Sequence, residues 1–410
     1  MSAFIFFVFC IVYLGMILGG LPFLQLDRTG IALLGAIALI AVGAVSPEQA
    51  AQSIHLPTLV LLFSFMVVSA QMRLGGFYAW VTRRLAAFAL SPPLLLAALI
   101  VVVAVLSAVF SNDIVCLAVA PVLIEVCLGR RLDPVPYLLA LACSANVGSA
   151  ATLIGNPQNM LIGETLKLSF AGYFAQAVGP VLLGLLATWG IIAYQMRGGW
   201  VSSDGDAVHT SAPDRRDDPV PLDRWQTAKG LSVAAVLVGV FLFLPTWPRD
   251  VAALTGAGLL LMSRKLHSNK MLGLVDWELL ILFIGLFVVN HALQRTGIVA
   301  GIVADLAAAG LNLDHAGTLF AATLVLSNVV SNVPAVMLLI PLTSHALAGP
   351  TLALVSTLSG NLLIVGSIAN IIVVNAAARR GIRINWQRHG RVGVPVTLAT
   401  LTICAVSLWW

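Results

Sequence analysis

Long runs of apolar residues dominate this chain and restrict the folds open to it. Of its 410 residues, 60% are hydrophobic and only 10% are charged, and the mean hydropathy is +0.99. So little polar surface cannot cover a water-soluble globule of this size. The runs are about 16 to 25 residues long, close to the length that a helix needs to cross the hydrocarbon core of a bilayer. The sequence therefore predicts an all-α polytopic membrane protein.

The runs form two sets of five, separated by a charged stretch at 197–228. This stretch combines prolines and glycines with several aspartates and arginines, which is typical of a solvated linker. We expect a first repeat at 1–196 and a second at 229–410. The predicted spans are 3–21, 30–46, 56–72, 136–163, 171–196, 229–245, 249–263, 276–293, 350–378 and 392–409.

Between the third and fourth span of each set, an amphipathic stretch (76–90 and 297–310) precedes two apolar arms joined by a short polar tip. The arms lie at 94–128 and 316–347, and their tips are Ser111-Asn112-Asp113 and Ser331-Asn332. A tip of two or three polar residues is too short to reach the surface. Backbone that is not helical is tolerated at membrane depth where protein or water surrounds it. We therefore predict two re-entrant helical hairpins.

Polar residues at the first tip recur in the second half with a constant offset of 220 residues. Ser107, Ser111, Asn112 and Pro121 correspond to Ser327, Ser331, Asn332 and Pro341. Recurrence at equal spacing argues against helix capping as the whole explanation for these serines and asparagines, because capping alone does not require the same spacing twice. The pattern indicates a duplicated unit.

Basic residues give the orientation of the spans. All 22 lysines and arginines except Lys167, Arg249 and Arg295 fall on one side of the predicted layout. By the positive-inside rule this side, which includes the linker, faces the cytoplasm, and both termini face outside in a plasma (inner) membrane. An odd number of spans per repeat then places the second repeat upside down relative to the first, as in many secondary transporters.

The fourth span of the first set and the fourth of the second contain glycine and amides at mid-span. Gly155 and Asn159 match Gly366 and Asn370 at a common offset of 211. Such residues predict a broken helix, whose free carbonyls and half-helix ends can bind ions. The candidate residues in these segments are Asn146, Gly148, Ser149, Thr152, Gly155, Asn156, Asn159, Asn361, Gly366, Ser367 and Asn370.

This set of residues suits the binding of a dehydrated cation together with an anion. Serine hydroxyls, asparagine carbonyls and unwound backbone carbonyls are hard oxygen donors, whereas helix N-termini receive anions. No lysine or arginine lies in the predicted core. Asp113 corresponds to Val333 in the second repeat, so the hairpin does not require an acid there. An acid at membrane depth suggests a proton carrier or a cation ligand.

Other chemistries find little support. The five cysteines lie within apolar segments without CxxC spacing, and the seven histidines show no HxxxH or HExxH spacing. We therefore expect no enzyme and no cofactor. Basic residues in short loops follow the positive-inside rule, so we expect no nucleic-acid partner. His291 and His345 are candidates for pH sensing.

At its tips and broken helices the chain resembles the ion transporter superfamily, which includes divalent-anion/sodium symporters, citrate transporters and arsenite-efflux permeases. The segments at 152–159, 327–334 and 360–370 are similar to the citrate-transporter-like and arsenite-permease branch. Both threonines of the superfamily's Ser-Asn-Thr tips are replaced. The resemblance implies sodium sites at Ser107, Ser111 and Asn112, with backbone near 148–155, and at Ser327, Ser331 and Asn332, with backbone near Gly366. Dimers are common in the superfamily.

The leading hypothesis is a secondary transporter that couples Na⁺ or H⁺ to a small anion or oxyanion, either a di- or tricarboxylate or an inorganic anion, by alternating access. A first alternative is an arsenite or metalloid efflux permease that exchanges its substrate for protons through Asp113. A second is a sodium/proton antiporter. Besides the substrate, the partner we expect is the lipid bilayer, and the resemblance to the superfamily implies a second copy of the chain in a homodimer.

Overall fold

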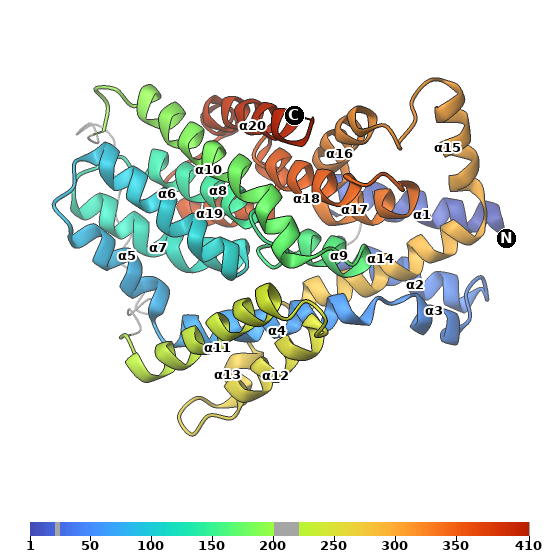
Figure 1. Cartoon of the computed structure of the whole chain (residues 1–410), viewed down its shortest axis with the longest axis horizontal. Coiled ribbons are helices and arrows are strands. Elements are labelled where there is room, and N and C mark those ends of the chain that lie inside the picture. The colour runs from blue at the N-terminus through green and yellow to red at the C-terminus, as the bar shows by residue number, and fades with distance from the viewer. Residues whose placement is uncertain (21–24, 201–220, 410) are drawn as a thin grey trace.

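The computed structural model describes residues 1–20, 25–200 and 221–409, and these residues form helices without any β-strand (Figure 1). The first half contains α1 (Ser2–Leu18), α2 (Arg28–Ala41), α3 (Pro47–Ser53), α4 (Leu56–Leu74), α5 (Phe77–Ala87), α6 (Pro92–Val109), α7 (Asn112–Gly129), α8 (Pro134–Ser149), α9 (Pro157–Thr165) and α10 (Phe170–Gln195). The second half contains α11 (Arg224–Phe243), α12 (Arg249–Leu261), α13 (Ser268–Leu272), α14 (Trp277–Arg295), α15 (Ile298–Ala308), α16 (Ala316–Val330), α17 (Asn332–Leu339), α18 (Ala348–Ser359), α19 (Ile368–Arg379) and α20 (Trp386–Trp409), with 3-10 turns η1 (Ile340–Leu342) and η2 (Ile364–Gly366).

The two halves contain the same elements in the same order. Even the short helices α3 and α13, which the sequence analysis did not predict, occupy equivalent places before the third span of each half. Much of the predicted linker lies outside the described residues. The next helix begins earlier than predicted, at Arg224, because the Asp223 carboxylate accepts hydrogen bonds from the N–H groups of Trp225 (3.0 Å) and Gln226 (3.1 Å).

Seven helices within the described ranges are long and apolar enough to cross a membrane: α4, α6, α7, α10, α11, α14 and α20. Other apolar helices, including α1, α2 and α16, are shorter. The long apolar helices, the hairpins and the broken helices together confirm the predicted fold class.

Each hairpin tip is a break of one or two residues. In the first hairpin, Phe110 and Ser111 are extended between α6 and α7. In the second, Ser331 alone separates α16 from α17, with φ of 78° and ψ of 159°. A positive φ is strained for a residue with a side chain. The two arms of each hairpin pack against each other.

Both predicted broken helices are interrupted in the middle. The first is α8 followed by α9, with irregular backbone at 150–156, and the second is α18 followed by α19, with η2 in the gap. Gly155 lies in the first gap, where an added Cβ would come within 2.8 Å of the Ser107 carbonyl oxygen. Glycine is required there because the first hairpin and the broken helix approach each other through their backbones.

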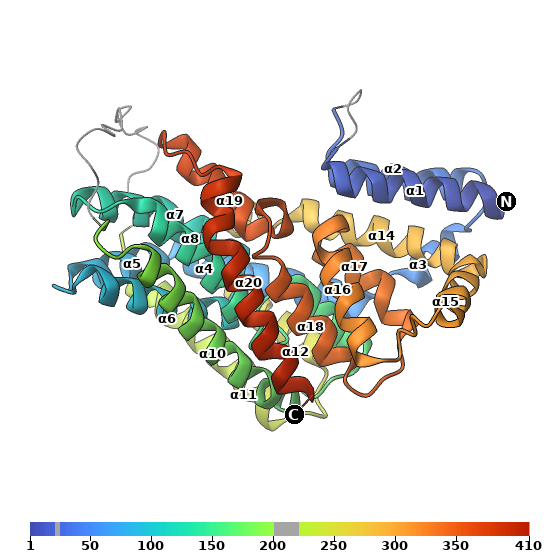
Figure 2. The same cartoon turned by 90° about the horizontal axis from the view of Figure 1, so that it is seen from above.

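The helices pack into two bodies. The first, which we call the scaffold, consists of α1, α2, α4, α11, α12, α13 and α14, with α4 against α12 and α2 against α14. In the internal repeat α2 corresponds to α12 and α4 corresponds to α14, so these two contacts are equivalent. The second, which we call the hairpin body, consists of α5 to α10 and α16 to α20. In Figure 1, α4, α11, α12 and α13 lie below the hairpin body, and Figure 2 shows α1 and α2 set apart from α19 and α20. The main bridge between the bodies is the contact of α4 with α9.

Candidate functional site

Asn146, near the end of α8, connects the two halves through its side chain. Its Oδ1 accepts hydrogen bonds from Asn112 Nδ2 (3.0 Å) and Ser367 Oγ (2.9 Å). Its Nδ2 donates to Asn361 Oδ1 (2.8 Å) and Asn370 Oδ1 (3.2 Å). Only 1% of Asn146 is exposed. One buried amide therefore holds the first tip against the broken helix of the second half.

A small cavity of about 30 Å³ lies where both tips meet both broken helices. Its walls include the first residues of four helices, α7, α9, α17 and α19. Each helix N-terminus carries about half a positive charge from the helix dipole, so four of them together favour an anion or a polarised oxygen. Among the described residues, no lysine or arginine lines this cavity. The residues that line it are Asn112, Asp113, Pro157, Gln158, Leu279, Ser331, Asn332, Val333, Ser367 and Ile368.

Beside the first tip, buried oxygen atoms lack hydrogen-bond donors. Ser107 Oγ and Asn112 Oδ1 have no partner, and Ser107 is fully buried. The carbonyl oxygens of Ser107 and Ser149 point toward Gly155, since an added Cβ there would overlap both. An unpaired buried oxygen is costly, so this cluster has the chemistry of a site for a dehydrated cation.

The second tip repeats this arrangement. Ser327 Oγ and Asn332 Oδ1 lack partners, as does Asn328 Oδ1. The carbonyl oxygen of Gly360 lies 3.0 Å from the place a Cβ would take at Gly366, and Asn328 Oδ1 lies 3.2 Å from it. The two clusters are therefore equivalent in chemistry as well as in position along the repeat. Asn328 is the additional oxygen donor that the sequence analysis did not select.

The remaining predicted residues of the first half stabilise the break. The Asn156 side chain caps α9 through the N–H of Asn159 (2.9 Å) and donates to Ser149 Oγ (3.0 Å). Asn159 Nδ2 donates to the Thr152 carbonyl (3.0 Å), and Thr152 Oγ1 donates to the carbonyl of Ala108 (2.5 Å). These side chains replace the helical hydrogen bonds that the break removes.

In the second half, the Asn370 side chain likewise replaces helical hydrogen bonds at the break. Its Nδ2 donates to the carbonyl oxygens of Gly360 (2.8 Å) and Leu363 (3.0 Å). Outside the predicted set, His389 of α20 hydrogen-bonds through Nε2 to the carbonyl oxygen of Asn361 at 3.0 Å and is 2% exposed. Thr357 accepts hydrogen bonds from Asn156 and Gln158. Sequence reasoning missed His389 because it lies in the first turn of a span, without a repeated neighbour.

Asp113 lies at the wall of the cavity. Within the described part of the chain its carboxylate forms no hydrogen bond and no ion pair, and Val333 lies on the same cavity wall in the other tip. The cavity is therefore asymmetric, with a carboxylate at one tip and an isopropyl group at the other. The candidates for pH sensing are elsewhere: His291 lines a separate cavity of about 240 Å³, and His345 accepts a hydrogen bond from Leu347 N–H in a loop.

The described residues hold no cluster of histidine, cysteine, aspartate and glutamate that could bind a transition metal. All five cysteines are free, and only Cys10 is exposed. Four lie buried among apolar neighbours, where cysteine packs as a small hydrophobic residue.

A helical, apolar chain whose two hairpin tips meet two broken helices at a buried polar site has the architecture of a membrane transporter. The chain belongs to the citrate transporter family, since the family model matches residues 4–358. It is therefore an integral membrane protein of the citrate and arsenite permease type.

Relatives and a solved structure agree with this class. An uncharacterized transporter of Mycobacterium tuberculosis is 29% identical, with 94% of each chain covered. The silicon efflux transporter LSI3 of rice, Oryza sativa subsp. japonica, is 30% identical over 93% of this chain and 92% of its own. The crystal structure of the YdaH transporter of Alcanivorax borkumensis, described as having an unusual topology, is similar over 100% of this chain and 98% of its own, with a TM-score of 0.56 and 14% identity. At that identity the likeness shows the fold alone.

Proposed function

We propose that this protein is a secondary transporter that couples a cation to the movement of a small anion or oxyanion by alternating access. The observation that carries the proposal is the arrangement at the tips, where four helix N-termini surround one cavity and an unpaired oxygen cluster flanks each tip. The N-termini supply positive potential for the anion, and the oxygen clusters supply ligands for cations such as Na⁺. Filling both together cancels charge in a buried site.

The two-body packing supports alternating access. The hairpin body holds both tips and both broken helices, and the scaffold contributes Leu279 to the cavity wall. A rigid hairpin body that slides or rotates against the scaffold would expose the same site to each side in turn. Substrate and coupling ion would then cross without a continuous pore.

Metalloid efflux is the second candidate function. The rice relative at 30% identity is named as a silicon efflux transporter. The described wall of the cavity carries no lysine or arginine that would favour an anion over a neutral substrate. In this case a neutral oxyacid would leave in exchange for protons, and Asp113 would be the proton carrier. A sodium/proton antiporter would use the same carboxylate without an additional substrate.

Thermal unfolding of the purified protein in sodium and in choline at equal ionic strength tests the coupling ion. A ligand that binds only the folded state at ten times its Kd raises the free energy of unfolding by about 1.4 kcal/mol. We expect sodium to raise the midpoint, and we expect Asn112→Ala and Asn332→Ala each to reduce the rise because each removes an unpaired oxygen. Equal midpoints in sodium and choline for the wild type would contradict sodium coupling and favour the proton-driven alternatives.

The same experiment with Asp113→Asn separates the roles of that carboxylate. We expect the variant to fold, because no hydrogen bond within the described chain depends on the acid. Loss of sodium stabilisation would place Asp113 beside a cation. If sodium stabilises the variant fully but a pH gradient no longer drives transport in proteoliposomes, Asp113 is the proton carrier. Unchanged sodium and pH-gradient responses would refute both roles.

A further inference from the structure

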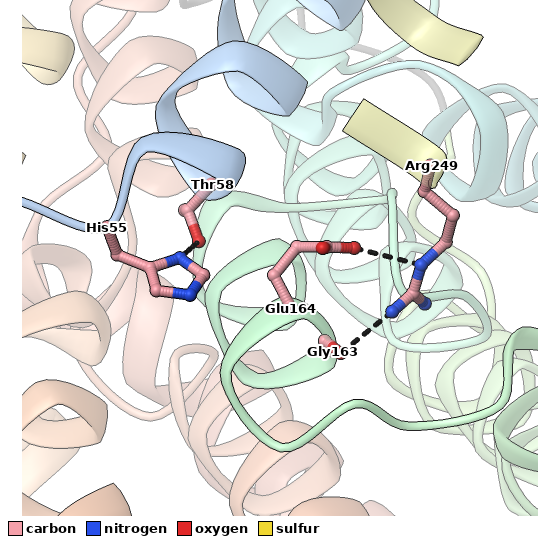
Figure 3. Close-up of polar contacts among 5 residues, drawn as sticks. All are labelled: His55, Thr58, Gly163, Glu164 and Arg249. Atoms are coloured by element: carbon pink, nitrogen blue, oxygen red, sulfur yellow. Dashed lines mark hydrogen bonds and ion pairs between the residues drawn. The ribbon is translucent and has the colours of Figure 1, made fainter. Parts of the chain in front are cut away.

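Glu164 and Arg249 form an ion pair between the two bodies (Figure 3). Glu164 lies in the last turn of α9, in the hairpin body, and Arg249 is the first residue of α12, in the scaffold. Arg249 Nε lies 2.8 Å from Glu164 Oε1. Arg249 Nη2 also donates to the Gly163 carbonyl oxygen at 2.8 Å. The guanidinium therefore holds both a side chain and the C-terminal backbone of the half-helix that lines the substrate cavity.

This pair lies on the face of the molecule opposite the linker. Helix α10 leads from the end of α9 to the linker, and α11 leads from the linker to the start of α12. Helices α10 and α11 are each long and apolar enough to cross a membrane, so the end of α9 and the start of α12 lie at the ends of these helices that point away from residues 197–200 and 221–223. His55 and Thr58, at the start of scaffold helix α4, lie beside the pair in Figure 3 and bond to each other at 2.8 Å.

The burial of the pair makes it unsuited to a purely stabilising role. The side chains of Arg249 and Glu164 are 14% and 6% exposed. Desolvation of two buried charges offsets most of their attraction, so an apolar contact would serve stability as well, whereas loss of one partner is costly. In several proteins a buried polar or ionic group selects one arrangement of the elements that it joins.

The surroundings allow the pair to separate. A cavity of about 420 Å³ adjoins it, lined by both partners together with Lys167, Asp250 and aromatic residues such as Phe170 and Trp247. Water in this space can solvate the two charges when the bodies move apart. The charged neighbours Lys167 and Asp250 flank Glu164 and Arg249, one on each body.

A second ion pair provides the contrast. Glu125 of α7 and Arg380, which follows α19, lie 3.2 Å apart with side chains 44% and 25% exposed. Both belong to the hairpin body, whose elements α7 and α19 pack directly against each other. This pair would move with the body, whereas the Glu164–Arg249 pair must break if the bodies move relative to each other.

We propose that the Glu164–Arg249 ion pair is a latch that holds the hairpin body against the scaffold in the arrangement seen here and opens in every transport cycle. The proposal rests on the proposed alternating access. It assigns to Glu164 and Arg249 the control of the balance between conformations, without contact with the substrate.

Distance measurement by pulsed electron paramagnetic resonance tests the latch without knowledge of the substrate. Spin labels would be placed at Ser268→Cys in the scaffold and Gln387→Cys in the hairpin body, both exposed and both on the side that the predicted topology assigns to the linker, after Cys10→Ser removes the exposed native thiol. We expect Glu164→Gln and Arg249→Gln to populate a second distance, with the ratio of the two states changed by about tenfold or more. The exchanged pair Glu164→Arg with Arg249→Glu should restore most of the original distance distribution. The restoration should be incomplete, because Arg249→Glu also removes the hydrogen bond to the Gly163 carbonyl oxygen.

Glu125→Gln is the matched control, because it removes an ion pair within one body, and its distribution should equal that of the wild type. A wild-type distribution in both latch variants, or the same shift in Glu125→Gln, would overturn the proposal. Thermal stabilisation by sodium, measured on the same samples, distinguishes failure of the proposed cation coupling from failure of the latch. Cation binding can be absent while the latch variants still shift the distance between the spin labels. If the single variants do not fold because one charge is left unpaired, the double variant Glu164→Gln with Arg249→Gln removes both charges and must populate the second distance. A wild-type distribution in this double variant would equally overturn the latch.

Discussion

At the scale of single residues, the site depends on which buried polar atoms have partners. Asn146 uses all four of its hydrogen bonds to join Asn112, Ser367, Asn361 and Asn370. Ser107 Oγ, Asn112 Oδ1, Ser327 Oγ and Asn332 Oδ1 have none. Satisfied amides fix the geometry, and the unsatisfied oxygens are the atoms that the proposed function assigns to a cation.

Asn146→Ala should therefore be strongly destabilising, because it leaves several buried polar groups without partners at once. We expect a loss of about 3 kcal/mol or more, since each buried group left unsatisfied costs about 1–3 kcal/mol. Asn290→Ala is the matched control: this buried scaffold asparagine accepts one bond from Tyr13 at 2.9 Å. Its loss should cost about 1 kcal/mol. Thermal unfolding midpoints compare the two, and equal shifts would contradict the central role of Asn146.

At the scale of elements, close contacts between helices keep the broken helices and hairpins in register. Gly148 of α8 faces Ala104 of α6 so closely that a Cβ would overlap the Ala104 backbone. The break in each span, the hairpin tips and the amphipathic stretches could all be placed from the sequence, because glycine, proline and amides within apolar runs are local signals. The short helices α3 and α13 could not, because nothing in their apolar periodicity distinguishes them from loops.

Gly148→Ala should destabilise the protein by about 1–3 kcal/mol, because the new methyl group forces α6 and α8 apart. Gly190→Ala in α10 is the control, since no atom lies within 4 Å of its added Cβ. Removal of a helical glycine there should stabilise by about 0.5–1 kcal/mol. If the unfolding midpoints of both variants move in the same direction, the close contact of Gly148 with α6 does not determine the effect of an added methyl group on stability.

At the scale of the whole molecule, the chain consists of two bodies joined at few places. The scaffold is built from α4 against α12 and α2 against α14, each a pairing of one half with the other. The hairpin body also draws helices from both halves, for example α7 with α19. Neither body can therefore assemble until both halves of the chain are present.

The orientation of the whole molecule in the membrane is a further testable prediction. By the positive-inside rule the linker face should be cytoplasmic and both termini outside. Thr246→Cys and Ser268→Cys, both exposed and predicted to lie on opposite faces, would be made in the Cys10→Ser background. A membrane-impermeable maleimide applied to intact spheroplasts should label only Thr246→Cys, and permeabilisation should add Ser268→Cys. The reverse pattern would invert the predicted topology.

The sequence by itself determined the membrane class, the duplication, the tips and the positions of the breaks. These features depend on the length of apolar runs and on residues close together in the chain, so local chemistry is sufficient to find them. Only the tertiary structure decided that Asn146 bridges to Asn370, 224 residues away, that Asn328 and His389 lie beside the predicted site residues, and that Glu164 meets Arg249 between the bodies. Such contacts depend on how distant helices pack, and one sequence contains no local pattern that encodes the partner of a buried polar group.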